Sequence, residues 1–544
     1  MQKNVEVVRE MLRSELYDSV ELLCGLQLSA LKEEDGLYHE YSELLADALF
    51  GKTHIRRSLT YYRKALACYS TSLGQVRNKD QQQPWKGQTV NDSKEVSLIV
   101  KICKCHLELN DASAAVKEME TIPTKLRTID INMLLGKLYR AANLKRMAIT
   151  AYKAVLCLQP YAIEAIQWLL SLGADAAEIE AIVAGAGPSD ATGVVHAWLK
   201  QLMTALICIK NCDHTQFMVQ YAVLSERFPQ NAWLKAKLAG SLLQADCAEE
   251  AMQVYRQIRI ADPSFTEGME LFGLALYDSG HARELNVLAN ELLALDPQRP
   301  CGWLSAALYC QLKGESEKAK TLADKAIDLD PLPSCFNIKG RILLAEGQSN
   351  DLAVIAFFQA NSLEKSLLSF AGLVQAHLTL NKIKEATSNA KDAITLLPKS
   401  AAAFTLVGQC LSRTTNGAME SLKAYSRALK LDPGNIKAAL LMSDTLVSQG
   451  KMHESLLCLR GVLERRQQSS QLRISFARVL INLGNYSEAI DQLHAAIAQA
   501  PTDSAEAVAE MERVEALLNA AEQEQATKCN RSGGKYGVED DSDI

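Results

Sequence analysis

Prolines recur along this chain at intervals of 34 residues, and this period constrains the fold more than any other feature of the sequence. The prolines that lie on the 34-residue grid, or within one residue of it, are Pro160, Pro229, Pro263, Pro297, Pro331, Pro398, Pro433 and Pro501. A fixed period of this length is typical of repeat proteins, in which each unit packs only against its neighbours. We therefore predict one continuous array, in place of the about three or four separate domains that the length alone would suggest.

The content of one period indicates the kind of repeat. Between residues 129 and 162 the marked positions are Leu135, Gly136, Tyr139, Ala148, Tyr152 and Pro160. This pattern resembles the tetratricopeptide repeat, in which Leu-Gly and an aromatic residue mark a first helix, while Ala, an aromatic residue and a closing Pro mark a second. The small residues let two antiparallel helices approach closely. Proline ends the second helix because it lacks a backbone N–H and restricts the residue before it.

The same pattern returns along most of the chain. Tyr255 precedes Pro263, Trp303 belongs to the period that ends at Pro331, and second helices often close with Leu-Asp-Pro, as at Pro297. We predict an all-α fold, a tetratricopeptide-repeat α-solenoid that winds as a right-handed superhelix. The predicted repeats begin near residues 39, 96, 129, 163, 198, 232, 266, 300, 334, 367, 401, 436 and 470. The unit near residue 163 is degenerate, because glycines at 173, 185 and 187 fall where regular helix is expected.

The array has predicted boundaries on both sides. Residues 1–38 form a helical cap, 39–72 the first repeat and 73–92 a flexible polar insertion. Residues 93–231 form an N-terminal array that includes the degenerate unit at 163–197, and 232–503 form a C-terminal array. A capping helix at 504–527 and a disordered acidic tail at 528–544 complete the chain.

Composition excludes several classes of function. The formal net charge of −6 gives no footprint for nucleic acid or for an anionic membrane surface. The first residues contain charges throughout and lack the apolar core of a secretory signal, and no apolar run approaches the length of a membrane span. The 14 cysteines are scattered singly, which favours a reducing compartment, and we expect the protein in the nucleus and cytoplasm.

Candidate metal and phosphate sites are weak. The densest clusters combine Cys103, Cys105 and His106, or Cys208, Cys212 and His214. Neither has the second ligand pair that a zinc site requires, and buried cysteine is commonly a small apolar residue. The Gly-Gly-Lys at 533–535 lies in the predicted tail and not between a strand and a helix, so it does not form a phosphate loop. We therefore expect no catalytic, metal or cofactor-binding residues and a protein that is not an enzyme.

Two modes of partner binding receive little support from the residues. A groove that grips an acidic C-terminus needs Lys and Asn at fixed first-helix positions. The unit at 129 instead has Met133 and Lys137 there, and the unit at 300 has Leu304 and Leu308. Basic pairs, such as the two arginines at 465–466, are interpreted as solvated helix faces.

Beyond the repeat consensus, the order of the N-terminal segments is distinctive. A cap reading VREMLRSELYDSVELLCGLQLS precedes the first repeat, ELLADALFGKTHIRRSLTYYRKAL, and the polar insertion. There follow KICKCHLELNDASAAVKEMETIP and INMLLGKLYRAANLKRMAITAYKAVLCLQPYAIEAI. This order resembles the subunit 7 family of the anaphase-promoting complex (cyclosome), from residue 4 to about residue 510.

The resemblance implies a scaffold role in a cell-cycle E3 ubiquitin ligase whose chemistry other subunits supply. It implies a homodimer formed through the N-terminal repeats, within roughly the first 230 residues. It also implies binding to other tetratricopeptide subunits, especially subunit 3, and to small accessory chains, without nucleic acid or membrane. The partner-binding residues themselves are not predicted. An unrelated tetratricopeptide adaptor for transport, transcription or chaperones, which binds peptides or helices in its groove, remains the alternative.

Overall fold

The computed structural model describes residues 2–32, 35, 37–79, 88–185, 195–347, 349–414, 417–466, 469–499 and 505–532. These residues form 29 α-helices and one short 3-10 helix, and the described ranges contain no strand. The all-α repeat fold predicted from the proline period is therefore confirmed. The chain divides into two compact units, residues 1–203 and 204–544.

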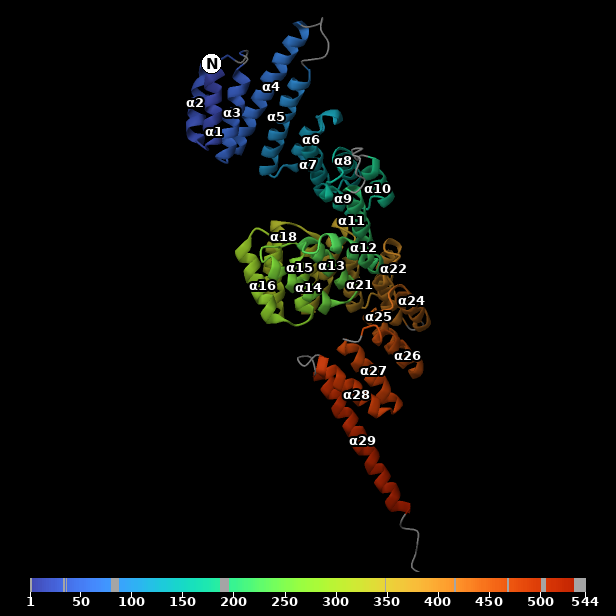
Figure 1. Cartoon of the computed structure of the whole chain (residues 1–544). Helices are drawn as coiled ribbons and strands as arrows, with labels where there is room; N and C mark the ends of the chain where they lie inside the picture. Colours follow the sequence, from blue (N-terminus) through green and yellow to red (C-terminus); the bar gives the residue numbers. More distant parts are fainter. Residues whose placement is uncertain are drawn as a thin grey trace, which may run out of the picture. The chain divides into compact units, whose positions relative to one another are not determined.

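The first unit contains a helical cap and the N-terminal repeats. Its helices are α1 (Gln2–Arg13), α2 (Tyr17–Ala30), α3 (Tyr38–Gly51), α4 (Ile55–Lys79), α5 (Gln88–Glu108), α6 (Ala112–Glu120), the 3-10 turn η1 (Thr124–Leu126), α7 (Ile129–Ala141), α8 (Lys145–Leu158), α9 (Ile163–Ser171), α10 (Ala176–Gly185) and the start of α11 (Val195–Lys210). Successive helices pack side by side, as α3, α4 and α5 do (Figure 1).

The second unit continues the array after α11. Its helices are α12 (His214–Arg227), α13 (Ala232–Gln244), α14 (Ala248–Ala261), α15 (Met269–Asp278), α16 (Ala282–Leu295), α17 (Pro300–Leu312), α18 (Ser316–Leu329), α19 (Pro333–Glu346), α20 (Asn350–Leu363), α21 (Leu367–Thr379), α22 (Ile383–Leu396), α23 (Ala401–Ser412), α24 (Ala418–Leu431), α25 (Ile436–Ser448), α26 (Met452–Leu463), α27 (Ser470–Leu483), α28 (Tyr486–Gln499) and α29 (Ala505–Ser532).

The register of these helices follows the sequence period. Ten of the thirteen first helices begin within one residue of the expected start, whereas α5 begins eight residues earlier, α11 three earlier and α15 three later. Side chains that accept the backbone N–H three residues on cap several of them, as Asn231, Ser400, Asn435 and Ser469 do. In the unit at 266 the helix starts late because Gly268, in the left-handed region, precedes it.

Three observed boundaries differ from those predicted. Helix α4 continues to Lys79 and α5 begins at Gln88, so helix occupies both ends of the predicted insertion, and residues 80–87 lie outside the described chain. Helix α29 continues to Ser532, beyond the predicted start of the tail, and residues 533–544 are not described. Polarity alone did not end these helices, because Gln, Lys, Arg and Glu are good helix formers.

The degenerate unit does form two helices, α9 and α10, but only of 9 and 10 residues. Gly173 separates them at φ +82°, and residues 186–194, which include part of the predicted glycine loop, are outside the described ranges.

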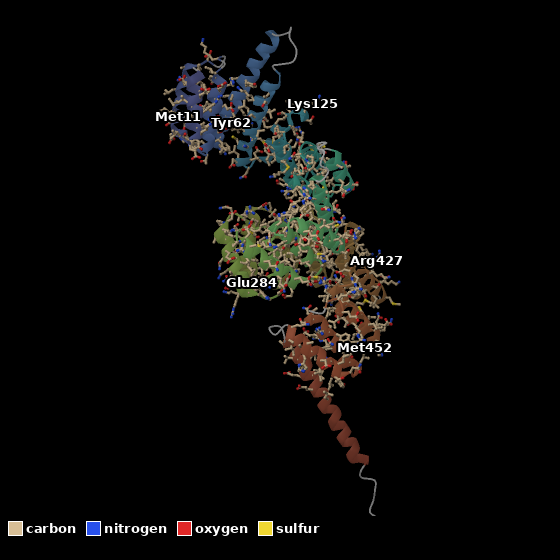
Figure 2. All side chains as sticks on the ribbon, viewed as in Figure 1. Met11, Tyr62, Lys125, Glu284, Arg427 and Met452 are labelled. Atoms are coloured by element: carbon tan, nitrogen blue, oxygen red, sulfur yellow. The ribbon has the colours of Figure 1, made fainter. Side chains whose placement is uncertain are left out.

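Side chains fill the spaces between paired helices in both units (Figure 2). Tyr62, labelled there, is one of the buried residues. Within the described ranges, no helix has the combination of length and apolar character that is needed to cross a membrane.

Candidate protein-binding surfaces

The predicted consensus positions form the joint inside a repeat. Leu135 and Tyr139 on α7, and Ala148 and Tyr152 on α8, are all buried. A Cβ on Gly136 would lie 2.5 Å from the Tyr152 ring. The glycine is therefore required, because the aromatic ring of the second helix lies directly against the first-helix backbone.

The other predicted positions have more varied surroundings. Tyr255 is fully buried. Trp303 is half-buried: its indole N–H donates to the Pro297 carbonyl at 2.8 Å, and the Lys325 ammonium lies 3.5 Å from its ring centre. Among the prolines, Pro160 is buried, Pro433 is half-buried, and Pro263, Pro297, Pro331 and Pro398 are exposed at second-helix ends. Pro501 lies outside the described residues.

The cysteine clusters do not form metal sites. Within the part of the chain that the structure describes, no three His, Cys, Asp or Glu side chains are grouped to hold a metal ion. Burial raises the pKa of Cys103 and of Cys212 to about 11 in each case, so both thiols stay protonated near neutral pH. Thiolates, not thiols, are the metal ligands.

The residues at the positions that an acidic-tail clamp would use make other contacts. Leu304 and Leu308 are buried, and the Lys137 ammonium lies 3.3 Å from the Glu164 carboxylate. These side chains therefore serve packing and neighbouring-repeat contacts.

A polar seam, which the sequence did not predict, joins distant repeats of the second unit. We define it by three ion pairs: Lys210–Glu364 at 3.4 Å, Asp213–Lys399 at 3.2 Å and Glu250–Arg466 at 2.7 Å. The partners are 154, 186 and 216 residues apart in sequence. The solenoid of this unit therefore winds far enough for one superhelical turn to contact the next, and Arg466 is not the solvated residue expected.

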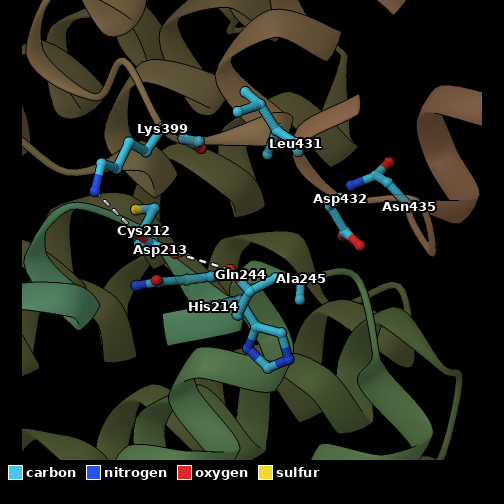
Figure 3. Close-up of a pocket in the computed structure, with 13 residues that line it drawn as sticks. Cys212, Asp213, His214, Gln244, Ala245, Lys399, Leu431, Asp432 and Asn435 are labelled. Atoms are coloured by element: carbon cyan, nitrogen blue, oxygen red, sulfur yellow. Dashed lines mark hydrogen bonds and ion pairs between the residues drawn. The ribbon is translucent and has the colours of Figure 1, made fainter. Parts of the chain in front are cut away.

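The middle of the seam forms a pocket (Figure 3). Asp213, which caps α12, faces Lys399 across it, and Asp432 and Asn435 line the other side. His214, also in the lining, lies with Nδ1 2.9 Å from the Ser241 hydroxyl. Burial lowers the pKa of His214, which favours its neutral form. The pocket is lined by helix ends, so its polar groups are engaged in capping and ion pairs.

The outer face of α2 is an apolar surface in the first unit. Val20 and Cys24 are buried against the cap, whereas Leu22 and Leu26, on the opposite side, are 65% and 58% exposed. Leu23 beside them is exposed as well. A helix that is apolar on both faces is normally covered on both. This face is therefore a candidate for contact with another chain.

Comparisons with known proteins agree with the repeat fold. A family model described as anaphase-promoting complex, cyclosome, subunit 3 matches residues 419–496. Anaphase-promoting complex subunit 7 of Arabidopsis thaliana is 28% identical over 520 residues, which cover 92% of each chain. The Homo sapiens subunit 7 is 26% identical over 560 residues, 98% of this chain and 96% of its own. A crystal structure of the APC/C hetero-tetramer Cut9-Hcn1 matches 93% of this chain and 95% of that chain, with a TM-score of 0.57 and 16% identity.

Fold and comparisons place the chain in the class of tetratricopeptide-repeat solenoids. Within that class the chain is similar, over nearly its entire length, to anaphase-promoting complex subunit 7. The resemblance found in the sequence is thus confirmed, and it supports a scaffold subunit of that complex.

Proposed function

We propose that this chain is a non-catalytic scaffold subunit of the anaphase-promoting complex, a cell-cycle E3 ubiquitin ligase. The observation that carries the proposal is the similarity to subunit 7 proteins of plant and animal origin over more than nine-tenths of the chain. The described residues are committed to repeat helices and their turns, and a solenoid of such repeats supplies extended surfaces for partners.

Sibling tetratricopeptide subunits are the partners that this function requires, subunit 3 first among them. The C-terminal repeats match the subunit 3 family model, and Dictyostelium discoideum subunit 3 is 26% identical over 126 residues. Relatedness of this kind supports stacking of similar arrays on one another. Small accessory chains are further partners, and a nuclear and cytoplasmic location accords with a cell-cycle ligase.

We also infer a homodimer formed through the N-terminal half. The outer face of α2 supports it, because Leu22 and Leu26 lie exposed on the helical cap. Obligate dimers bury more than about 2,000 Å² in total, so α2 would be the apolar centre of a larger surface.

Purification of the tagged chain from dividing cells tests the scaffold function. Cullin, RING and sibling tetratricopeptide subunits should be recovered in stoichiometric amounts when the eluate is analysed by mass spectrometry. Recovery of chaperones, motor chains or transcription factors without those subunits would contradict the proposal and favour an unrelated adaptor.

The dimer has its own test in the variant Leu22→Lys, Leu26→Lys. Two charges on this face should prevent pairing, while the helix, already exposed there, still folds. Light scattering at submicromolar concentration should give about twice 59.7 kDa for the original chain and one such mass for the variant. Leu457→Lys, at a 70% exposed leucine in the second unit, is the control and should stay dimeric. A monomeric original chain would refute the dimer.

A further inference from the structure

Helix α20 carries an exposed apolar face in the second unit. Leu352, Ile355 and Phe358 are 55%, 53% and 65% exposed. Their spacing of three residues places them along one side of the helix, as a ridge. Exposed apolar residues are ordinary when single, but a contiguous row on one helix marks an interaction surface.

The repeats provide an internal comparison, because the other second helices occupy equivalent places. The residues that align with Leu352, Ile355 and Phe358 are Lys318, Thr321 and Asp324 in α18, and Glu420, Lys423 and Ser426 in α24. Both sets are polar or charged, as expected for helix faces in water. The fold therefore does not require apolar residues at these positions.

Packing inside the repeat does not explain the ridge either. The opposite side of α20 buries Ala353, Phe357 and Ala360. Phe357 fills the joint so closely that a Cβ on Gly340 or on Gly372 would collide with its ring. The core of this repeat is thus complete without the outer residues.

Charged pairs lie at both ends of the ridge. Asp351 is 3.5 Å from Lys382 at one end, and Glu364 is 3.4 Å from Lys210 at the other. An apolar centre with a polar rim is the usual composition of a protein–protein contact.

The size and shape of this face indicate the occupant. Three side chains in a single row form a surface much narrower than the about 800 Å² per partner of a stable dimer, so this ridge alone would not hold two copies together. A single ridge with helical spacing fits between the side chains of another helix. We propose that the outer face of α20 is a docking surface for the apolar side of an amphipathic helix from a different chain of the assembly, an inference that rests on the scaffold function proposed above.

Photo-crosslinking of the full chain tests this directly. Benzoylphenylalanine is placed at Phe358 and, as a control, at Asp324, the equivalent position of α18. After irradiation of dividing cells, the tagged chain is purified and the crosslinked residues are identified by mass spectrometry. The probe at 358 should react with apolar positions, spaced three or four residues apart, in a different subunit, and at least tenfold more than the probe at 324.

Crosslinks into a second copy of the chain, crosslinks within the chain itself, or equal yields at both positions would overturn the inference. The same eluate reports whether sibling subunits copurify. Their presence without the crosslink overturns only the α20 surface, whereas their absence overturns the scaffold function too.

A substitution series gives an independent readout. The variant L352K/I355T/F358D receives the residues that α18 already has, so its melting temperature should not fall. It should recover at least tenfold less of the crosslinked subunit. The matched control E420K/K423T/S426D places the same three residues in α24 and should recover that subunit fully. Full recovery by the α20 variant would contradict the proposal.

Discussion

Single glycines set the distance between paired helices in this solenoid. Gly136 faces Tyr152, Gly408 faces Tyr425, and in each case a Cβ on the glycine would overlap the ring. The two helices of a repeat can therefore approach only where the first has no side chain. Burial raises the pKa of the Tyr152 phenol to about 12, in agreement with its deep position.

The space around each glycine predicts opposite effects for two Gly→Ala substitutions. Gly136→Ala should destabilise the protein by about 1–3 kcal/mol, because the added methyl group overpacks a filled joint. Gly461→Ala, in α26, has open space around its Cβ and should stabilise by up to about 1 kcal/mol through helix propensity. Urea unfolding followed by circular dichroism measures both. A neutral Gly136→Ala would mean that the aromatic ring moves freely.

The consensus residues inside a repeat could be predicted from the sequence, because a local sequence pattern determines where they lie. Leu135, Ala148 and Tyr152 are buried where the repeat consensus expects. The exposure of the outer α20 residues was not predicted, because an apolar residue at helical spacing is normally interpreted as a core residue. In the structure the alanines at 353 and 360 lie on the buried side of the helix, so the large apolar side chains lie on the exposed side.

The turn between the two helices of a repeat is a second recurring device, at the scale of the element. In most of these turns one described residue has a positive φ, and Cys212, Asp246, Gly280 and Gly314 occupy this place at intervals of 34 residues. Glycine adopts the left-handed region without a steric penalty, whereas a residue with a Cβ is strained there. The two non-glycine turns are therefore local weak points.

Substitutions to and from glycine at equivalent turns should reveal this backbone strain. Asp246→Gly, at φ 57°, should raise stability by about 1 kcal/mol, and Gly280→Ala, at φ 72°, should lower it by a similar amount. Differential scanning calorimetry on the full chain provides the comparison. If Asp246→Gly lowered the melting temperature, its carboxylate would have to contribute more than the backbone strain costs.

Element boundaries were predictable where proline or a turn residue marks them, and less so elsewhere. Most first helices that follow a Pro-ended unit begin as expected, for example α13 and α17, whereas α15 begins three residues late, after Gly268. The end of α4, the start of α5 and the end of α29 were misjudged, because these segments are polar but rich in good helix formers, and α4 continues through Gly74. Helix propensity and polarity are different properties, and the 34-residue proline period reports on neither of them.

At the scale of the second unit, the seam is a property of the whole winding. Glu250, on α14, and Arg466, in the turn after α26, are 216 residues apart in sequence, and their contact depends on the small rotation added at every repeat between them. A sequence period gives the number of repeats but not that rotation. Long-range ion pairs of this kind therefore cannot be read from spacing, even when every helix is correctly predicted.

Charge reversal on both sides of the seam should measure the coupling between these distant repeats. Glu250→Arg and Arg466→Glu should each destabilise, and the double variant should recover about 0.5–1 kcal/mol of the summed loss. The cost of a cation in the first turn of α14 is common to the single and double variants and cancels in the cycle. In 1 M salt the recovered energy should shrink, because the pair is only partly buried.

Hydrogen exchange separates a true seam from an incidental surface pair. Arg466→Glu should speed exchange in residues 210–216 about two- to fivefold, although these lie some 250 positions away in sequence. Arg460→Glu breaks an ion pair between neighbouring second helices, with Glu488, and should leave that segment unchanged. Equal exchange in both variants would mean that the turns of this solenoid are held apart from one another by the repeats alone, and that the seam adds no stability to the winding.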